Sequence, residues 1–358
     1  MPDRDVGSGA YVVDARGLES PLTGIGRYVE SLLVNLPGGI PDGMLGVARP
    51  GTDVHPAGLR IERLRPDAWN SVWNETRLAP YLRGARSYWA TKSQVPWTAP
   101  RSCTVVSTVH DVFHRTHPDD FSRQRRLDLG NATRASVKRA DIIAVTCPHV
   151  SAELRRYYGR SADVVVSPAP TVPDAAPADV EALRDRLPPS IDRWVLFVGN
   201  LVARKNVVAL ADAVATLPGV GLLVVGEPVE TAIASALSGR PDVVINGYAG
   251  QQQLAAYFAV ADVLGLVSHV EGFGLPLLDA RAKGIPVVVS DRAPLPDNGG
   301  PHATVVDPLS TPSIADGLRS ALDGDRPPPE RLASWGDSAA IMAAVLGLPA
   351  SVPTPPGR

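Results

Sequence analysis

The sequence predicts an α/β fold made of two Rossmann-like, doubly wound domains that face each other across a cleft. The clearest signs are short β-branched runs at 194–198, 222–225 and 263–267, which helical patterns separate. Apolar runs of this length are typical of strands buried on both faces of a parallel sheet. The same alternation occurs in the first half of the chain, and 358 residues are long for a single core. Two sheets covered by helices are therefore expected.

The predicted elements alternate along both halves of the chain. In the first half we expect strands over 11–14, 104–109, 141–145 and 163–166, a helix ending at 36, and helices over 119–139 and 148–158. In the second half we expect strands over 194–198, 222–225, 243–245, 263–267 and 286–289, with helices over 206–217, 230–237, 251–260 and 277–283. The predicted domains are then 1–170, a Pro-, Ala- and Asp-rich linker over 171–190, 191–330, and a segment 331–358 that holds a helix crossing the domain junction and a disordered tail.

Composition narrows the classes of protein to consider. Hydrophobic residues make up 44% and charged residues 20%, as in soluble globular proteins. A net charge of −2 offers no electrostatic basis for binding nucleic acid. Two cysteines, Cys103 and Cys147, are too few for a disulfide scaffold and are typical of a reducing compartment. Because we find no apolar signal core and no run of membrane-spanning length, we expect a cytoplasmic protein.

The segment 271–279 is the most informative motif. It follows an apolar strand and leads into a predicted helix. Gly272 and Gly274 allow a sharp turn and a close approach of the backbone to a ligand. A helix that starts directly after such a turn presents free amides and a positive dipole end, which suit a phosphate. Two carboxylates, Glu271 and Asp279, bracket the turn. The alternative is an ordinary helix start beside a carboxylate.

A basic turn follows the first strand of the second half. Gly199 and Asn200 come directly after the strand, Arg204 and Lys205 stand just beyond, and Asn206 is placed to cap the next helix. Two adjacent cations at the end of a strand suit a diphosphate. The alternative is a solvated basic turn. Because the two motifs share one edge of the predicted sheet, we favour a site for a nucleotide-diphosphate sugar.

Two weaker signals lie at strand ends in the first half. Gly24 and Gly26 follow the first strand, where a simple tight turn is an equally good interpretation. His110 ends the strand 104–109, where it is either a polar contact for a reacting group or a hydrogen-bonded structural side chain. His114 and His117 are nearby, but their spacing matches no metal site, so we predict none.

In order and spacing these motifs resemble those of retaining glycosyltransferases with the GT-B fold, a large group that includes bacterial mannosyl- and glucosyltransferases. The matching segments are 23–28, 110–113, 198–206, 254–262, 271–276 and 284–288. One position departs from the family pattern, because the family usually has glutamate where this chain has Asp279. The shorter side chain pulls the carboxylate back by about one bond length, which weakens a hydrogen bond to ribose unless the helix shifts or a water bridges the gap.

The resemblance assigns roles to individual residues. It implies that Arg204 and Lys205 bind the donor diphosphate, that Glu271 contacts the donor sugar, and that His110 approaches the sugar from the N-terminal domain. It implies donor contacts at Gly24, Gly26, Gly199, Asn200, Tyr248, Gly272, Phe273, Gly274, Leu275 and Asp279, with Asp279 on the ribose and Tyr248 beside the base. The N-terminal domain would then bind the acceptor and the C-terminal domain the nucleotide sugar.

The reaction implied is metal-independent hexosyl transfer to an acceptor hydroxyl with retention of anomeric configuration, and no cofactor besides the nucleotide-sugar co-substrate. Two alternatives remain, a catalytically silent homologue that binds a nucleotide sugar or supports a partner enzyme, and an epimerase-type enzyme on the same fold. The acceptor is a small molecule, a glycan or a lipid-linked sugar. The donor base and the oligomeric state are not predicted.

Three further sequence features bear on partners. Aromatic residues at 69–74, 88–89 and 97 offer surfaces for an acceptor or pack in the core. The arginine-bearing helix 123–139 is either a solvated face or a weak peripheral contact with an anionic membrane. The Pro-, Ala- and Arg-rich composition suggests a high-GC bacterial source, with surface glycans or secondary metabolites as products.

Overall fold

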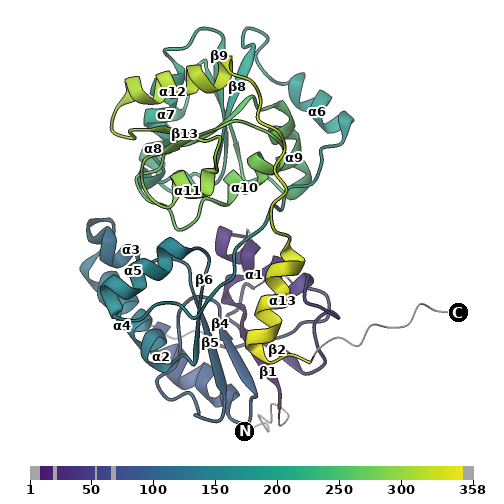
Figure 1. The fold of residues 1–358 in the computed structure, drawn as a ribbon, viewed down its shortest axis with the longest axis vertical. Coiled ribbons are helices and arrows are strands. Elements are labelled where there is room, and N and C mark those ends of the chain that lie inside the picture. The colour runs from purple at the N-terminus through teal and green to yellow at the C-terminus, as the bar shows by residue number, and fades with distance from the viewer. Residues whose placement is uncertain (1–8, 19–21, 53–54, 66–69, 350–358) are drawn as a thin grey trace, which may run out of the picture. The chain divides into compact units, whose positions relative to one another are not determined.

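The computed structural model describes residues 9–18, 22–52, 55–65 and 70–349, which form two compact units (Figure 1). Unit 1 holds the described residues up to Pro168 together with those from Ala333 onward, and unit 2 holds Ala169–Leu332. Each unit is built around one parallel sheet. The predicted fold class, α/β with two Rossmann-like domains, is confirmed.

Unit 1 contains a seven-stranded sheet in the order β3-β2-β1-β4-β5-β6-β7, with parallel pairing throughout. The strands are β1 (Tyr11–Asp14), β2 (Met44–Ala48), β3 (Arg60–Arg63), β4 (Ser87–Ala90), β5 (Thr104–Val109), β6 (Ile142–Val145) and β7 (Val164–Val165). The α-helices are α1 (Gly24–Val34), α2 (Asn70–Trp73), α3 (Phe113–Thr116), α4 (Arg123–Arg139), α5 (Pro148–Tyr158) and α13 (Trp335–Leu346). Short turns of other helix types are η1 (Ala15–Gly17), η2 (Asn74–Leu78), η3 (Ala79–Leu82) and η4 (Pro118–Asp120). The strand order reverses between β1 and β4, and ligands bind at such points in doubly wound sheets.

Three strands of unit 1, β2, β3 and β4, were not predicted from the sequence. None of them shows a continuous β-branched run. The edge strand β3 consists of Arg-Ile-Glu-Arg, and β4 begins with Ser-Tyr-Trp. Gly46 interrupts β2, and a Cβ there would lie 3.2 Å from side-chain atoms of Ala15, Leu59 and Ile61, so the strand packs closely because this position is a glycine.

Unit 2 contains a six-stranded parallel sheet in the order β10-β9-β8-β11-β12-β13. The strands are β8 (Arg193–Val198), β9 (Val220–Val225), β10 (Val243–Gly247), β11 (Val263–Leu266), β12 (Val287–Ser290) and β13 (Thr304–Val306). The helices are α6 (Pro177–Arg184), η5 (Ala203–Lys205), α7 (Val207–Val214), α8 (Thr231–Leu237), α9 (Gln251–Val260), α10 (Leu275–Ala282), α11 (Leu295–Gly299) and α12 (Thr311–Asp323). The predicted strands are all present, whereas β13, α11 and α12 were not predicted.

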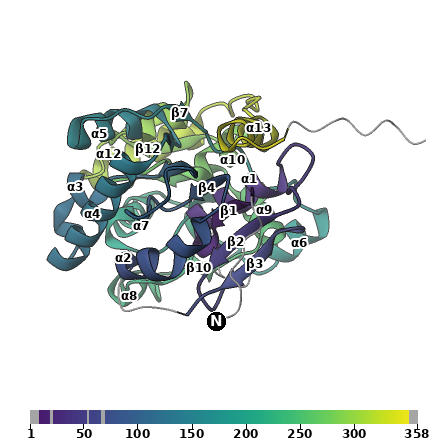
Figure 2. The same cartoon turned by 90° about the horizontal axis from the view of Figure 1, so that it is seen from below.

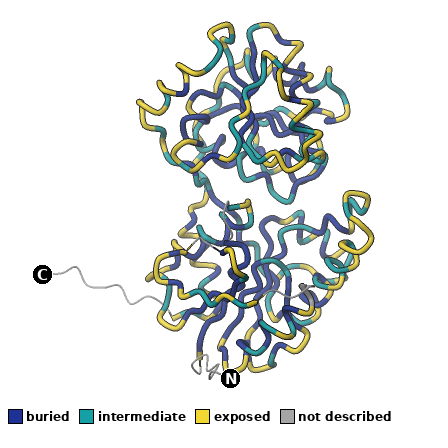
Figure 3. Tube along the Cα trace, turned by 180° about the vertical axis from the view of Figure 1, so that it is seen from behind, coloured by how far each residue is buried: buried dark blue, intermediate teal, exposed yellow. Residues whose placement is uncertain are grey.

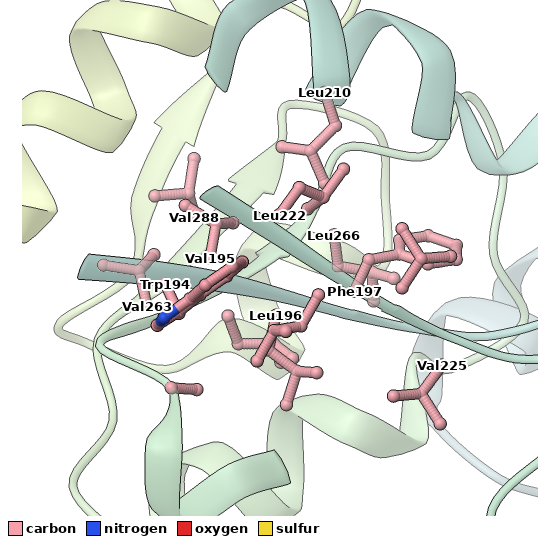
Figure 4. Close-up of a cluster of buried hydrophobic side chains, with 14 of the residues drawn as sticks. Trp194, Val195, Leu196, Phe197, Leu210, Leu222, Val225, Val263, Leu266 and Val288 are labelled. Atoms are coloured by element: carbon pink, nitrogen blue, oxygen red, sulfur yellow. The ribbon is translucent and has the colours of Figure 1, made fainter. Parts of the chain in front are cut away.

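The core of unit 2 lies on both faces of its central strand, β8. Trp194, Val195, Leu196 and Phe197 are all buried, and Figure 4 shows them among side chains from β9, β11, β12 and α7. Helices cover both faces of the sheet, so consecutive residues of the strand are apolar rather than alternating. The central strands of each unit, such as β1, β4, β9 and β11, are buried throughout, and in Figure 3 the dark blue of buried residues fills the middle of each unit while yellow lies mostly at its outside.

The linker predicted over 171–190 is instead part of unit 2. Its helix α6 packs against α9, and Leu183 joins the hydrophobic core of the unit. The Pro-, Ala- and Asp-rich composition describes a solvent-facing helix and its flanks rather than a free connection. The chain passes between the units next to Pro168 and again next to Leu332.

The C-terminal helix α13 belongs to unit 1, where it lies beside α1 (Figure 2). It begins with a capping box in which Ser334 and Asp337 bind each other's backbone N–H groups. Met342 and Leu346 are buried on its inner face. The tail predicted to be disordered lies mostly outside the described residues. Among the helices of the described ranges, none has both the length and the apolar composition that a membrane span requires.

Candidate active site

The candidate site in unit 2 lies where β8 and β11 end. The two strands are paired in parallel, with Val195 opposite Val263, so the segments that follow them leave the same edge of the sheet. A backbone hydrogen bond joins these segments, because the N–H of His269 donates to the carbonyl of Arg204 at 2.8 Å. The fold therefore brings the basic turn and the glycine turn together, as the sequence predicted.

A buried ion pair joins the two turns. The ammonium of Lys205 donates to Oε1 of Glu271, and the side chains are 13% and 7% exposed. Ser268 Oγ donates to the same oxygen at 2.8 Å. Arg204 Nη1 lies 3.8 Å from Oε2 of Glu271 and donates to the carbonyl of Val270 at 3.3 Å. Burial lowers the pKa of Lys205, while the Glu271 carboxylate beside it acts in the opposite direction.

The glycine turn ends at Gly274, the N-cap residue of α10. Its backbone is left-handed, with φ of +86°, and a Cβ there would lie 2.9 Å from a methyl group of Leu295. Only glycine meets both conditions without strain. Leu275 is the first helical residue and Pro276 the second. The N-terminal turn of α10 therefore starts next to the Lys205–Glu271 pair, as an anion site requires.

Asp279 is buried, and two of its hydrogen bonds join segments of unit 2. Its Oδ1 accepts the backbone N–H groups of Thr171 at 2.6 Å and Val172 at 2.8 Å. Thr171 and Val172 belong to the first segment of unit 2, so the Asp279 carboxylate connects that segment to α10. The predicted contact of Asp279 with ribose stays a prediction.

The other edge positions of unit 2 have distinct environments. Gly199 follows β8, and its carbonyl oxygen would lie 1.9 Å from a Cβ at Gly226, which follows β9; the two strand ends thus pack backbone against backbone. Asn200 is exposed, and Tyr248 is 40% exposed just after β10. Asn206 differs from the prediction, because its side chain does not cap α7.

The Asn206 backbone is left-handed, with φ of +57°. Its amide instead donates to the carbonyls of Val267 at 3.1 Å and Pro308 at 2.8 Å. The residue therefore joins the end of β11 to the loop after β13, a contact between segments remote in sequence.

In unit 1, His110 directly follows β5. Its Nε2 lies 2.8 Å from the carbonyl of Thr91, so this nitrogen carries the proton and donates. The ring meets Tyr28 edge-on, with centroids 5.3 Å apart. Burial lowers the pKa of His110 to about 4, so the imidazole is neutral at pH 7 and Nδ1 is an acceptor.

The two glycines at the start of α1 differ in their surroundings. Gly26 is buried, and a Cβ there would lie 2.4 Å from the carbonyl oxygen of Gly17, so packing explains this glycine. Its N–H donates to Thr23 Oγ1 at 3.3 Å, which caps the helix. Gly24 is exposed at the first helical position.

The nearby histidines do not converge. His114 is buried and lies 2.5 Å from the hydroxyl of Tyr158, which is a structural contact. Across the described residues, no group of three or more His, Cys, Asp or Glu side chains has the arrangement of a metal site.

The aromatic residues considered as acceptor surfaces are mostly core. Trp73, Tyr88 and Trp89 are fully buried, so the packing interpretation is correct for them. Trp97 is 52% exposed. Trp69 lies outside the described residues.

Comparison with known proteins decides the family. Residues 179–340 match the family model described as glycosyl transferases group 1. This segment is a group 1 glycosyltransferase domain, and the chain is a glycosyltransferase. It is 24% identical over 359 residues to O-antigen chain mannosyltransferase B of Escherichia coli, covering 86% of this chain and 89% of that protein. It is 28% identical over 318 residues to D-inositol 3-phosphate glycosyltransferase of Xylanimonas cellulosilytica, covering 79% of this chain and 73% of that protein.

Solved structures show the same fold. The Anabaena Alr3699/HepE structure in complex with UDP and glucose has a TM-score of 0.69 at 17% identity, and the match covers 94% of this glycosyltransferase and 95% of that chain. The two Rossmann-like units are thus those of the GT-B class.

Several contacts at these strand ends were not predicted from the sequence. Ser268 holds Glu271, and Ser290 Oγ in turn donates to the Ser268 carbonyl at 2.6 Å. Gly226 packs against Gly199. In unit 1, Arg16 forms a buried bidentate pair with Asp14, at 2.8 and 2.7 Å, at the end of β1. A buried serine or a short-range Asp-X-Arg pair has no sequence signal that separates it from ordinary surface residues.

Proposed function

We propose that this glycosyltransferase moves a hexose from a nucleotide-diphosphate donor to an acceptor hydroxyl, with retention of anomeric configuration and without a metal ion. The observation that carries the proposal is the buried Lys205–Glu271 pair beside Arg204 and the N-terminus of α10. Two cations and a helix N-terminus suit a diphosphate, and a neighbouring carboxylate suits sugar hydroxyls. The relatives named above include a mannosyltransferase and a fold relative in complex with UDP and glucose, which supports a nucleotide-sugar donor.

The chemistry follows from where charge develops. As the bond from the anomeric carbon to the phosphate oxygen breaks, the sugar becomes positive and the diphosphate negative. Lys205, Arg204 and the amides at the start of α10 stabilise the leaving group without rearranging, because hydrogen bonds already hold the two cations and the helix fixes the amides. These cations supply the charge that a metal ion supplies in other transferases.

Retention follows if the acceptor hydroxyl attacks from the side of the leaving group. The new bond joins the acceptor oxygen to the anomeric carbon, and the hydroxyl proton passes to the departing phosphate oxygen. Glu271 contacts the sugar hydroxyls, with Oε1 held by Lys205 and Ser268. His110 is the further polar contact that the resemblance assigns to the sugar, and its neutral ring offers Nδ1 as an acceptor.

A thermal-shift titration with UDP, GDP, ADP and dTDP, each with and without EDTA, tests the donor site. At a nucleotide concentration of about 100 times Kd, binding adds about 2.7 kcal/mol, or roughly 5–10 °C for a domain of this size. We expect one nucleotide to give this shift with EDTA present, and Lys205→Ala to reduce it to about half or less at the same nucleotide concentration. The control is Arg193→Ala, which removes an exposed ion pair with Asp323.

Product analysis then separates the alternatives. The matching nucleotide sugar is incubated with candidate acceptors, and NMR coupling constants give the anomeric configuration of the product. An inverted product contradicts retention, and a shift lost with EDTA contradicts metal independence. Binding without turnover favours the silent homologue, and a changed sugar released without an acceptor favours epimerase-type chemistry. The class of acceptor, and a weak contact of α4 with an anionic membrane, stay predictions.

A further inference from the structure

Helix α10 begins at the glycine turn and, further along, holds the segment by which the chain enters unit 2. Asp279 and Lys283 are one helical turn apart. Asp279 accepts the N–H groups of Thr171 and Val172, and Lys283 Nζ donates to the carbonyl of Pro173 at 2.8 Å. The entering segment is therefore attached to the helix that carries the proposed donor site.

Arg281, between these two positions, holds the segment by which the chain leaves unit 2. Its Nε and Nη2 donate to the two carboxylate oxygens of Glu330, at 3.1 and 2.7 Å, and the N–H of Glu330 donates to the Arg281 carbonyl at 3.0 Å. The hydrogen bonds from Arg281 lower the pKa of Glu330. A Cβ at Gly300 would lie 2.7 Å from Nε, so glycine there leaves room for the guanidinium. A bidentate pair of this kind fixes the guanidinium plane.

The remaining side-chain nitrogen of Arg281, Nη1, is connected through Asn298 to the glycine turn 271–274, here called the donor turn. Nη1 donates to the carbonyl of Asn298 at 2.6 Å, and Asn298 Nδ2 donates to the carbonyl of Phe273 at 2.7 Å. Phe273 stands between Gly272 and Gly274, where the backbone has the most freedom to adopt other conformations. These two hydrogen bonds therefore restrain a segment whose glycines would otherwise allow several backbone conformations.

We propose that Asn298 and Arg281 are positioning residues for the donor turn. The chain of contacts from Phe273 through Asn298 and Arg281 to Glu330, here called the α10 relay, holds the turn in the conformation that receives the donor. It also ties the turn to the segment by which the chain leaves unit 2. The donor part of this inference rests on the proposed function, whereas the relay itself can be tested in the ligand-free protein.

Hydrogen–deuterium exchange on the full-length protein tests the relay. Asn298→Ala removes the donor to Phe273 but keeps the Asn298 carbonyl that Arg281 binds. Loss of one hydrogen bond raises exchange in peptides covering 272–277 by roughly 2- to 10-fold. Glu330→Gln weakens the far end of the relay and should raise exchange in the same peptides. Because both changes act on one chain of contacts, the double variant should exceed the larger single effect by less than twofold.

The matched control is Arg193→Ala, which removes an exposed ion pair elsewhere in unit 2 and should leave exchange at 272–277 unchanged. In the active enzyme, Asn298→Ala should raise the KM for the donor by roughly 5- to 10-fold and leave the KM for the acceptor unchanged. A general loss of stability would not raise the KM for the donor while leaving the KM for the acceptor unchanged.

The outcomes distinguish the two proposals. Unchanged exchange at 272–277 in both variants overturns the relay, whatever the activity. An equal rise of exchange in the Arg193→Ala control also overturns it, since the effect would not be specific. Exchange effects as expected, in an enzyme that neither binds nor turns over any nucleotide sugar, support the relay and overturn both the proposed function and the donor role.

Discussion

Lys205→Met separates the structural from the functional contribution of the buried ion pair. The substitution keeps most of the apolar stem of the side chain and removes its charge. It leaves the Glu271 carboxylate buried, with Ser268 at 2.8 Å and Arg204 at 3.8 Å as remaining partners. The matched double variant Lys205→Met/Glu271→Leu removes both charges.

The expected loss follows from the burial of the pair. Removing one partner of a buried ion pair costs about 3–5 kcal/mol, and since Glu271 keeps two partners we expect the lower end. For a domain of this size, about 3 kcal/mol lowers Tm by roughly 6–12 °C. An apolar replacement of the whole pair is often neutral, so the double variant should melt within about 3 °C of the wild type.

Calorimetry of the full-length protein measures Tm, and isothermal titration with the preferred nucleotide measures affinity. Both variants should lose nucleotide affinity by roughly 10- to 150-fold, because a hydrogen bond to a charged group contributes about 1.5–3 kcal/mol. In the double variant, Tm should therefore stay close to that of the wild type while nucleotide affinity falls. The reasoning is refuted if Lys205→Met melts within about 1 °C of the wild type, or if either variant binds nucleotide normally.

Three further predictions concern single positions. Asp279→Glu, which introduces the residue usual in the family, should lower stability by about 1–3 kcal/mol in chemical denaturation, because the longer side chain displaces a carboxylate that accepts two backbone N–H groups; an equally stable variant would contradict this. Gly274→Ala should cost more than about 1 kcal/mol and weaken nucleotide binding, since φ is +86° and the added Cβ would lie 2.9 Å from Leu295; a neutral effect on both would show that the turn readjusts. The pKa of His110 is about 4 when folded and about 6.5 when unfolded, so its contribution is complete above pH 6.5 and is lost as pH falls toward 4. Melting curves across this range should be less pH-dependent in His110→Gln than in the wild type, and parallel curves would contradict the assignment.

The pattern of apolar runs predicted the sheet of unit 2 well, because its strands are buried on both faces and must be continuously apolar. It failed for β3 and β4, because neither strand contains a continuous β-branched run: β3 is an edge strand made mostly of charged residues, and β4 begins with Ser-Tyr-Trp. The Pro, Ala and Asp content of 171–190 predicted a linker, and this prediction was wrong. The segment belongs to unit 2 because α6 packs against α9 and Leu183 lies in the hydrophobic core.

The candidate site shows the same division. By itself the sequence determined which groups stand at the strand ends, because the glycines, the adjacent cations and Glu271 belong to short local motifs whose chemistry depends on residue type and spacing. Only the tertiary structure decided what those groups touch. It paired Lys205 with Glu271, gave Ser268 to the same carboxylate, turned Asn206 away from its helix, and set Asp279 on the first segment of unit 2. The physical reason is that buried polar groups must find hydrogen-bond partners away from water. Apart from Ser268, the partners that meet this demand here are about 60 to 110 residues away in sequence.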